Sequence, residues 1–133
     1  MNALLLVGSP KGRKSASCLL GSILAEGMRK HGAIVSEGFV HEGLRSEDGI
    51  ARLLDSVDAA DLVIFAFPLY IDSLPAPLTR LLERIAERRA RIAPAGSPRL
   101  AVVVQCGFPE AHQCGTAVGI CQLFADRTGM RWA

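Results

Sequence analysis

The chain has 133 residues, a formal net charge of +2 and a hydrophobic share of 50%. This length suits one domain with a substantial core, and so small a charge argues against a nucleic-acid-binding protein. The sequence has neither a run of about 18 apolar residues that could span a membrane nor the cleavage site of a signal peptide, so we expect residues 1–133 to form one cytoplasmic domain that contacts neither nucleic acid nor membrane.

The first strand and the first helix are predicted by two clear patterns. Residues 3–7 (ALLLV) are continuously apolar, which is typical of a buried strand. From Ser15 onward the apolar residues are spaced by one, three and four, which predicts a helix that carries them on one face. Glycine suits a left-handed cap, so the helix is expected to end at His31 and Gly32. The residues that share this face are Leu19, Leu20, Ile23, Leu24 and Met28.

A weaker strand and a second helix follow. Residues 33–40 (AIVSEGFV) predict the strand, and the polar residues 41–49 predict a loop. The helix after this loop carries an apolar stripe over residues 50–57, with Ser46 or Asp48 as its candidate N-cap.

The second half of the chain contains two strands of the fully buried kind. Residues 61–67 (DLVIFAF) and 100–104 (LAVVV) are apolar on both faces, as in parallel sheets that are covered by helices on both sides. Between them lies a proline-rich loop over residues 68–77, in which Pro77 can begin a helix.

The helix after Pro77 carries many arginines. Its apolar positions predict a buried face, and its charged positions predict a solvated face with ion pairs inside the helix. A docking patch for an anionic partner is the alternative interpretation. The charged positions are Arg80, Arg84, Arg88, Arg89 and Arg91, together with Glu83 and Glu87.

The last helix has its own buried stripe and ends at Gly129. Ile120 and Leu123 lie off the stripe and are candidates for contact with a partner chain. The alternation of strands and helices along the chain predicts an α/β three-layer sandwich with an open, mostly parallel sheet and right-handed crossovers. The stripe of the last helix is formed by Cys114, Ala117, Val118, Cys121, Phe124 and Ala125.

The four cysteines do not form a recognisable metal site. No two of them are in a CxxC pair, and their spacing matches neither zinc sites nor the usual iron–sulfur runs. We therefore expect reduced, partly buried thiols and no metal. The cysteines are Cys18, Cys106, Cys114 and Cys121.

Three unusual loops follow the strong strands. Open parallel sheets bind ligands beyond the carboxyl ends of their strands, where the strand order reverses. The loops at that end are residues 8–17 (GSPKGRKSAS), 68–77 (PLYIDSLPAP) and 105–113 (QCGFPEAHQ). Their convergence predicts a ligand site.

The first loop is close to the nucleotide-binding pattern GxxxxGK[ST]. Lys14 and Ser15 match, but the second glycine is Gly12, one position early, and Arg13 would strain or block a loop of that kind. The candidate magnesium-positioning strand ends in Pro68 rather than aspartate. A nucleoside triphosphatase is therefore disfavoured, and the absence of GxGxxG leaves a Rossmann-type NAD site unsupported.

The same loop also fits an anion site at the start of a helix. Ser15 and Ser17 lie at the head of the first helix, where free N–H groups and the helix dipole favour negative charge. Ser9 adds a third hydroxyl, and the loop is basic. Such a cradle suits a phosphomonoester without magnesium, whereas the simpler interpretation makes Ser15 only an N-cap.

The second and third loops offer walls for a flat ligand. Pro68 and Pro75 hold Tyr70 at the same edge of the sheet, where an aromatic ligand could lie against its ring. Gly107 and Phe108 could form the opposite wall. A tyrosine that only packs over a helix end is the alternative.

The segments GSPKGRKSAS, FPLYIDSLPAPLTRLLE and QCGFPEAHQC, in this order and spacing, resemble the ligand loops of the NAD(P)H-dependent FMN reductase branch of the flavodoxin-like superfamily. The resemblance spans nearly the whole chain, and PLYxDSLPAP is its most specific part. In that family the first loop holds the FMN phosphate and the other two flank the isoalloxazine ring. The resemblance thus implies phosphate contacts at Ser9, Lys11, Arg13, Ser15, Ala16 and Ser17, and ring contacts at Pro68, Leu69, Tyr70, Ile71, Gly107 and Phe108.

The resemblance also implies an activity and an architecture. A hydride would pass from NAD(P)H, the co-substrate, through FMN to a small-molecule electron acceptor, and no catalytic side chain is demanded. The implied sheet order is 2-1-3-4-5 in a homodimer or tetramer. A flavodoxin-like electron carrier and a non-catalytic interaction module without flavin stay open as alternatives. Because the sequence ends at residues 131–133, we expect the fifth strand to be a stub and the single domain to be short at its C-terminus.

Overall fold

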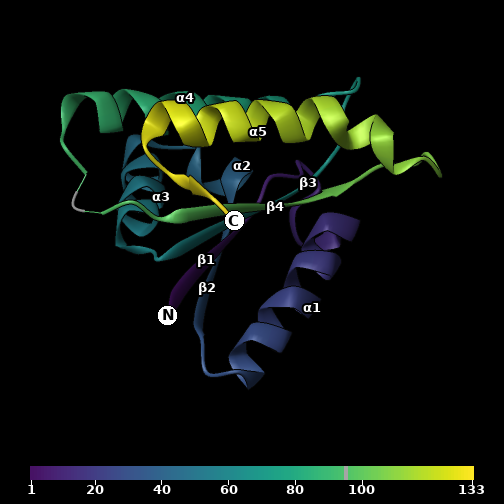
Figure 1. Ribbon diagram of the computed structural model, residues 1–133, viewed down its shortest axis with the longest axis horizontal. Coiled ribbons are helices and arrows are strands. Elements are labelled where there is room, and N and C mark those ends of the chain that lie inside the picture. The colour runs from purple at the N-terminus through teal and green to yellow at the C-terminus, as the bar shows by residue number, and fades with distance from the viewer. Residues whose placement is uncertain (95) are drawn as a thin grey trace.

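Five parallel strands form one sheet in the computed structural model, which describes residues 1–94 and 96–133 (Figure 1). Their order is β2-β1-β3-β4-β5, as predicted, and every pair in the sheet is parallel. The predicted stub is confirmed, because β5 has two residues that pair only with Arg99 and Leu100. The strands are β1 (Asn2–Val7), β2 (Ile34–Phe39), β3 (Leu62–Pro68), β4 (Arg99–Gln105) and β5 (Arg131–Trp132).

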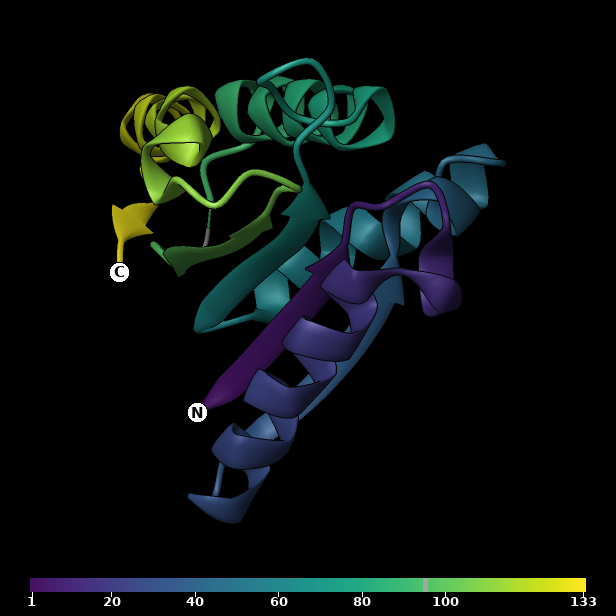
Figure 2. The same ribbon diagram turned by 90° about the vertical axis from the view of Figure 1, so that its right-hand side faces the viewer.

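Helices cover both faces of the sheet, which gives the three layers that the alternation predicts. Figures 1 and 2 show α1 on one face and α3, α4 and α5 on the other. In the described part of the chain, no helix is both long and apolar enough to cross a membrane. The helices are α1 (Ala16–Lys30), α2 (Val40–Gly43), α3 (Glu47–Ala59), α4 (Ala76–Arg91) and α5 (Gly115–Thr128), with short 3-10 turns η1 (Gly12–Lys14) and η2 (Ala111–Cys114).

The short helix α2 corrects the loop predicted over residues 41–49. The loop prediction is wrong at its start, because the chain continues from β2 directly into a helical turn over Val40–Gly43. Val40 is fully buried, and its carbonyl accepts a hydrogen bond from the Leu44 amide. Burial of Val40 thus stabilises a helical turn in a segment whose other residues are mostly polar.

The core lies on both faces of the central strands β1 and β3. Leu6, Phe65 and Phe67 are fully buried under the helices of one face, and Leu5 and Ile64 are buried under α1 on the other. Each large side chain removed from water in this way stabilises the fold by about 1.5–3 kcal/mol. The loops at the carboxyl ends of β1 and β3 therefore leave from rigid positions.

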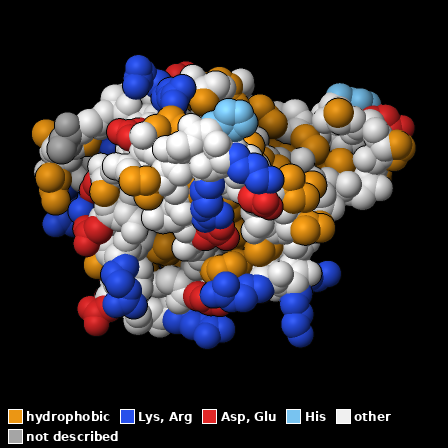
Figure 3. Space-filling model, turned by 90° about the horizontal axis from the view of Figure 1, so that it is seen from below, with side chains coloured by type: hydrophobic (Ala, Val, Ile, Leu, Met, Phe, Trp, Pro, Cys, Tyr) orange, Lys and Arg blue, Asp and Glu red, His pale blue; other side chains and the backbone are white. Residues whose placement is uncertain are grey.

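Helix α1 turns its leucines and Ile23 away from the sheet, whereas Met28 packs partly against the core. The predicted residues do share a face, but Leu19 is 63% exposed and Ile23 is 59% exposed. The face that meets the sheet is made of small residues, and a Cβ on Gly21 would lie 3.0 Å from both terminal methyls of Leu5. Close approach of helix and sheet thus takes precedence over burial of the apolar stripe. Seen from the α1 side, patches of hydrophobic surface lie among basic and acidic side chains (Figure 3).

The arginines of α4 are not simply a solvated face. Arg88 pairs with Asp55 at 2.7 Å and Asp58 at 2.8 Å, so its partners lie on α3 rather than inside α4. Arg84 pairs with Glu87 of its own helix at 3.8 Å, and more closely with Glu47 of α3 at 3.1 Å. The prediction of intrahelical pairs is therefore wrong for Arg88 and incomplete for Arg84, because two helices on the same sheet face bring their charged flanks together.

The predicted N-cap of α3 is confirmed at Ser46, whose Oγ accepts a hydrogen bond from the Gly49 amide at 3.0 Å. Ser46→Ala is expected to lower the free energy of unfolding by about 1 kcal/mol, because this first-turn amide loses its partner. Ser56→Ala is the matched control, since its Oγ only donates to the Arg52 carbonyl inside the same helix. Urea denaturation of both variants measures the difference. Equal stability of the two variants would contradict the capping role.

Candidate functional site

The three predicted loops meet at one edge of the sheet. They leave the carboxyl ends of β1, β3 and β4, which lie together on the right-hand side of Figure 1 and face the viewer in Figure 2. A pocket of about 320 Å³ opens between them. It is lined by Ser9, Lys11, Lys14, Ser15, Ala16, Ser17, Pro68, Leu69, Tyr70 and Gln105.

Several amides of the loop after β1 donate within the loop itself. The Gly12 amide donates to the Ser9 carbonyl at 3.0 Å, and the Ser15 amide donates to the Gly12 carbonyl at 3.1 Å. The Lys14 amide donates to the Lys11 carbonyl at 3.3 Å. A P-loop instead directs successive amides at the phosphates. This loop is therefore a self-bonded 3-10 turn in front of a helix, which supports the anion-site interpretation over the P-loop.

Gly12 sets the shape of that turn. Its φ is +54°, a left-handed conformation that glycine adopts without strain. A Cβ at this position would also lie 2.7 Å from the ring of His41. The glycine that seemed one position early for a P-loop is thus required by this turn itself.

The serines at the head of α1 differ in what their hydroxyls do. Ser15 Oγ donates to the Gly12 carbonyl at 2.7 Å and accepts from the Cys18 amide at 3.0 Å, so it is an N-cap whose hydroxyl is already engaged. Ser17 is 1% exposed, and its Oγ has no hydrogen-bond partner among the described residues. The amides of Ala16 and Ser17 lie in the first turn, where a helix supplies no acceptor. Ser17 is thus a pocket-lining residue whose buried hydroxyl is bonded to no group in the described part of the chain.

The end of the pocket beside α1 is basic. Lys11 and Lys14 line it together with the positive end of the α1 dipole, and no Asp or Glu is among the lining residues. Arg13, predicted as a further phosphate residue, is not among them, and its guanidinium lies 4.3 Å from the centre of the Phe39 ring. Ser9 does line the pocket and accepts a hydrogen bond from the Lys11 amide at 3.3 Å.

The loop after β3 forms the apolar wall. The Leu69 amide donates to the Gln105 carbonyl at 2.9 Å, which ties this wall to the end of β4. Tyr70 and Ser73 exchange two backbone hydrogen bonds around a tight turn, in which Ile71 and Asp72 have φ values of 50° and 58°. Left-handed backbone is unfavourable for a β-branched residue, and Ile71 is fully exposed. Such strain at a solvent-facing loop tip is characteristic of functional sites.

The loop after β4 contributes less to the pocket than predicted. Gly107 and Phe108 are exposed and are not among the lining residues, whereas Gln105 is. This loop projects from the molecule on the right in Figures 1 and 3. Gln105 and Lys14 were missed as site residues. The place of Gln105 at the carboxyl end of a predicted strand was the signal that could have revealed it, although the prediction that this strand is fully buried is wrong, because only Leu100 of β4 is buried.

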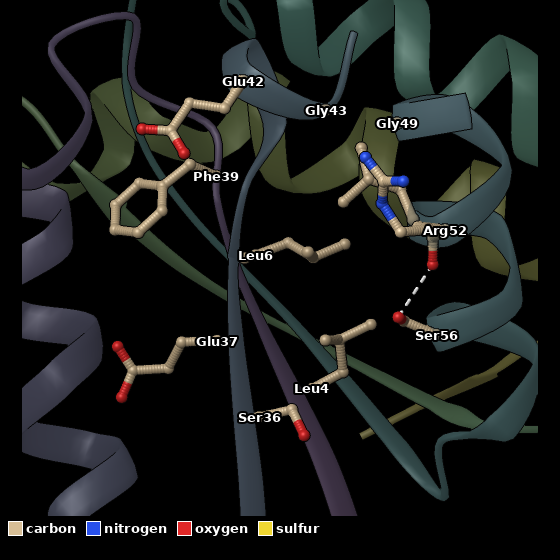
Figure 4. Close-up of a pocket in the computed structure, with 12 residues that line it drawn as sticks. Leu4, Leu6, Ser36, Glu37, Phe39, Glu42, Gly43, Gly49, Arg52 and Ser56 are labelled. Atoms are coloured by element: carbon tan, nitrogen blue, oxygen red, sulfur yellow. Dashed lines mark hydrogen bonds between the residues drawn. The ribbon is translucent and has the colours of Figure 1, made fainter. Parts of the chain in front are cut away.

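A second hollow, of about 350 Å³, lies between β2 and α3 (Figure 4). Leu4 and Leu6 form its floor, and Arg52 and Ser56 lie on its α3 side. The hydrogen bond drawn there runs from Ser56 Oγ to the Arg52 carbonyl and only stabilises α3. Because Gly38 has no side chain to fill this space, we interpret the hollow as a packing gap beside an edge strand.

Comparison with known proteins gives one match to a family and many to solved structures. Residues 1–117 match the model of a family described by its flavodoxin-like fold. No match was found among curated proteins.

Three of the similar solved structures illustrate the likeness. A WrbA-like flavodoxin from Agrobacterium tumefaciens superposes with a TM-score of 0.74 and 20% identity, over 99% of this chain and 76% of that one. An NADPH-quinone reductase from P. pentosaceus superposes with a TM-score of 0.74 and 18% identity, over 100% of this chain and 82% of that one. An NADH:FMN oxidoreductase in its apo form superposes with a TM-score of 0.76 and 19% identity, over 98% of this chain and 71% of that one. At these identities the likeness establishes the fold.

Proposed function

The chain belongs to the flavodoxin-like family, and from that premise we propose that it is an FMN-dependent oxidoreductase that takes a hydride from NAD(P)H and passes electrons to a small acceptor. The observation that carries the proposal is Ser17, a pocket-lining residue whose buried hydroxyl has no hydrogen-bond partner among the described residues. Buried polar groups are nearly always hydrogen-bonded in folded proteins. A bound phosphate would supply the missing acceptor.

The residues of the pocket fit a phosphomonoester. The amides of Ala16 and Ser17 and the hydroxyl of Ser17 would bind its oxygens, and Lys11 and Lys14 would balance its charge. Ser15 would act indirectly, since its hydroxyl fixes the turn that presents these groups. None of these contacts needs a magnesium ion.

The other end of the pocket fits a flat ring. Pro68 and Leu69 offer an apolar surface, and Tyr70 is half-exposed beside them. A pocket of about 320 Å³ is at the lower end of the range for small-molecule sites, so part of the ring would remain open to a second substrate. Bound FMN supplies the hydride chemistry itself, and the protein supplies position and exclusion of water.

We expect the purified protein to bind FMN at one site per chain. Flavin fluorescence and its anisotropy are the suitable measurements, because Trp132, the only tryptophan, lies on β5 and pairs with Leu100 away from the pocket. Riboflavin is the matched control ligand, since it has the same ring without the phosphate, and it is expected to bind at least about tenfold more weakly. Unchanged FMN anisotropy at saturating protein would refute the cofactor assignment.

The second part of the experiment separates an enzyme from a carrier. NADPH or NADH added without oxygen is expected to bleach the bound flavin within seconds if the protein has a pyridine-nucleotide site. Slow or absent bleaching with normal FMN binding would instead indicate a flavodoxin-like electron carrier.

One observation favours a second candidate, an interaction module without flavin. The outward face of α1 exposes Leu19, Leu20, Ile23 and Leu24, a larger apolar surface than single surface residues create. Such a face suits contact with another chain, and we propose that it joins copies of this chain in a homo-oligomer. An oligomer that never binds FMN would favour this candidate over the oxidoreductase.

A further inference from the structure

The loop after β1 is held from outside the pocket by two rings at the junction of β2 and α2. A Cβ on Gly12 would lie 2.7 Å from Cε1 of His41, so the imidazole packs directly against the backbone of the turn. The guanidinium of Arg13 lies 4.3 Å from the centre of the Phe39 ring. The two rings contact each other edge to face, with centres 6.5 Å apart. Figures 1 and 2 show this loop beside α2.

The geometry of η1 separates the three cations of the loop. In a 3-10 helix, residues three apart lie on the same side. Lys11 and Lys14 are three apart and both line the pocket, whereas Arg13 does not. Its charge instead faces the π surface of Phe39, which is only 7% exposed, in a cation–π contact. Arg13 is thus directed at the end of β2 and not into the pocket.

Hydrogen bonds connect this contact to the head of α1. The Gly12 carbonyl accepts from the Ser15 amide at 3.1 Å and from the Ser15 hydroxyl at 2.7 Å. The same hydroxyl accepts from the Cys18 amide at 3.0 Å and caps the helix. A shift of Gly12 would therefore move the N-cap, and with it the amides of the first turn.

We propose that Phe39 and His41 are positioning residues for the anion site: they hold η1 in place, and Arg13 acts through them and not on the phosphate. The inference rests on the proposed binding of FMN, because the groups that are positioned are those assigned to its phosphate. It adds a role for β2 and α2, neither of which contributes a lining residue to that pocket.

A double-mutant cycle on FMN affinity tests the coupling. Arg13→Ala and Phe39→Leu each remove the cation–π contact, and each is expected to raise the Kd for FMN about three- to fivefold. The double variant is expected to bind little more weakly than either single variant, because the same contact is lost only once. Lys14→Ala is the matched cation, and its effect is expected to multiply with that of Phe39→Leu. Fluorescence anisotropy of FMN measures every Kd.

Amide hydrogen exchange gives a second readout that needs no flavin. The amides of Gly12 and Ser15 donate within the loop, so loss of its support exposes them to solvent more often. Both are expected to exchange several times faster in Arg13→Ala, Phe39→Leu and His41→Ala than in the wild type. The amides of β1 are the internal control and are expected to exchange at the wild-type rate.

Each result decides a separate question. Wild-type protein that does not bind FMN would refute the proposed function, whereas unchanged exchange in the loop would overturn the positioning role whatever the flavin does. Multiplying effects of Arg13→Ala and Phe39→Leu would overturn it too, since Arg13 would then act on the phosphate independently. So would an equal loss of riboflavin and FMN binding, because only FMN carries the phosphate. Melting curves establish folding, and the exposed Arg13 keeps the exchange test decisive if Phe39→Leu does not fold.

Discussion

Ser17→Asp is expected to abolish FMN binding, with Kd raised by at least about a hundredfold. The new carboxylate would lie in the first turn of α1, next to the amides of Ala16 and Ser17 that would bind the proposed phosphate. Two like charges about 4 Å apart at a partly buried site repel each other by several kcal/mol, which corresponds to that loss. Ser17→Ala removes only the hydroxyl and is expected to cost about tenfold. Fluorescence anisotropy of FMN measures both.

The matched control is Ser22→Asp, which introduces the same charge on the same helix but away from the pocket-lining residues. It is expected to leave Kd nearly unchanged. Lys14→Ala is expected to weaken binding only a few-fold, because solvent and salt screen an exposed charge. Aspartate is favourable near a helix N-terminus but costs stability at a buried position such as Ser17, so the melting curve of Ser17→Asp establishes that the variant is folded before its affinity is compared. Unaltered FMN affinity in a folded Ser17→Asp protein would refute the phosphate site.

Arg89→Leu is expected to lower the free energy of unfolding by about 3 kcal/mol. Arg89 is 8% exposed, and its Nε and Nη2 donate to the carbonyls of Thr128 at 2.8 Å and Gly96 at 3.0 Å. Its Nη1 lies 3.6 Å from Asp58. Burial lowers the pKa of Arg89, with Asp58 opposing this, yet an arginine remains charged at any ordinary pH. Its removal leaves two carbonyls without their charged donor, and each such bond contributes about 1.5–3 kcal/mol.

Arg80→Leu is the control for this substitution. Arg80 lies on the same helix and is exposed, so its replacement is expected to change stability by less than about 0.5 kcal/mol. Urea denaturation at neutral pH compares the two variants under identical conditions. Equal unfolding midpoints for both would show that the contacts of Arg89 contribute nothing to the net stability.

The centre of the sheet was predictable because the cores of β1, β3 and β4 are continuous apolar runs separated by strong breaks. Residues 3–7 and 61–67 needed no knowledge of tertiary contacts to be recognised, and they lie in the central strands β1 and β3. The face of α1 that packs against the sheet was harder to predict from the sequence. Spacing shows that Leu19 and Ile23 share a face, but the approach of Gly21 to Leu5 decides which face meets the sheet.

Individual side-chain roles depend on partners that are distant in the sequence. Nothing near Arg89 distinguishes it from Arg88, since its acceptors belong to the end of α5 and to the segment before β4. The same holds in the site. The three loops were predictable from their place after strong strands, whereas only the hydrogen bonds show that the Ser15 hydroxyl is engaged and that the Ser17 hydroxyl has no partner among the described residues.

The parallel sheet also has a consequence for how the chain folds. Leu4 pairs with Ser36 on one side and with Val63 on the other. All four strand pairs of the sheet are parallel, so no two neighbouring strands can be joined by a short hairpin. Each pairing requires a long loop to close first, and the entropy of that closure is lost before the contacts form. The helices can form early from local contacts. The kinetic barrier should therefore lie in aligning β1 with partners from two distant parts of the chain.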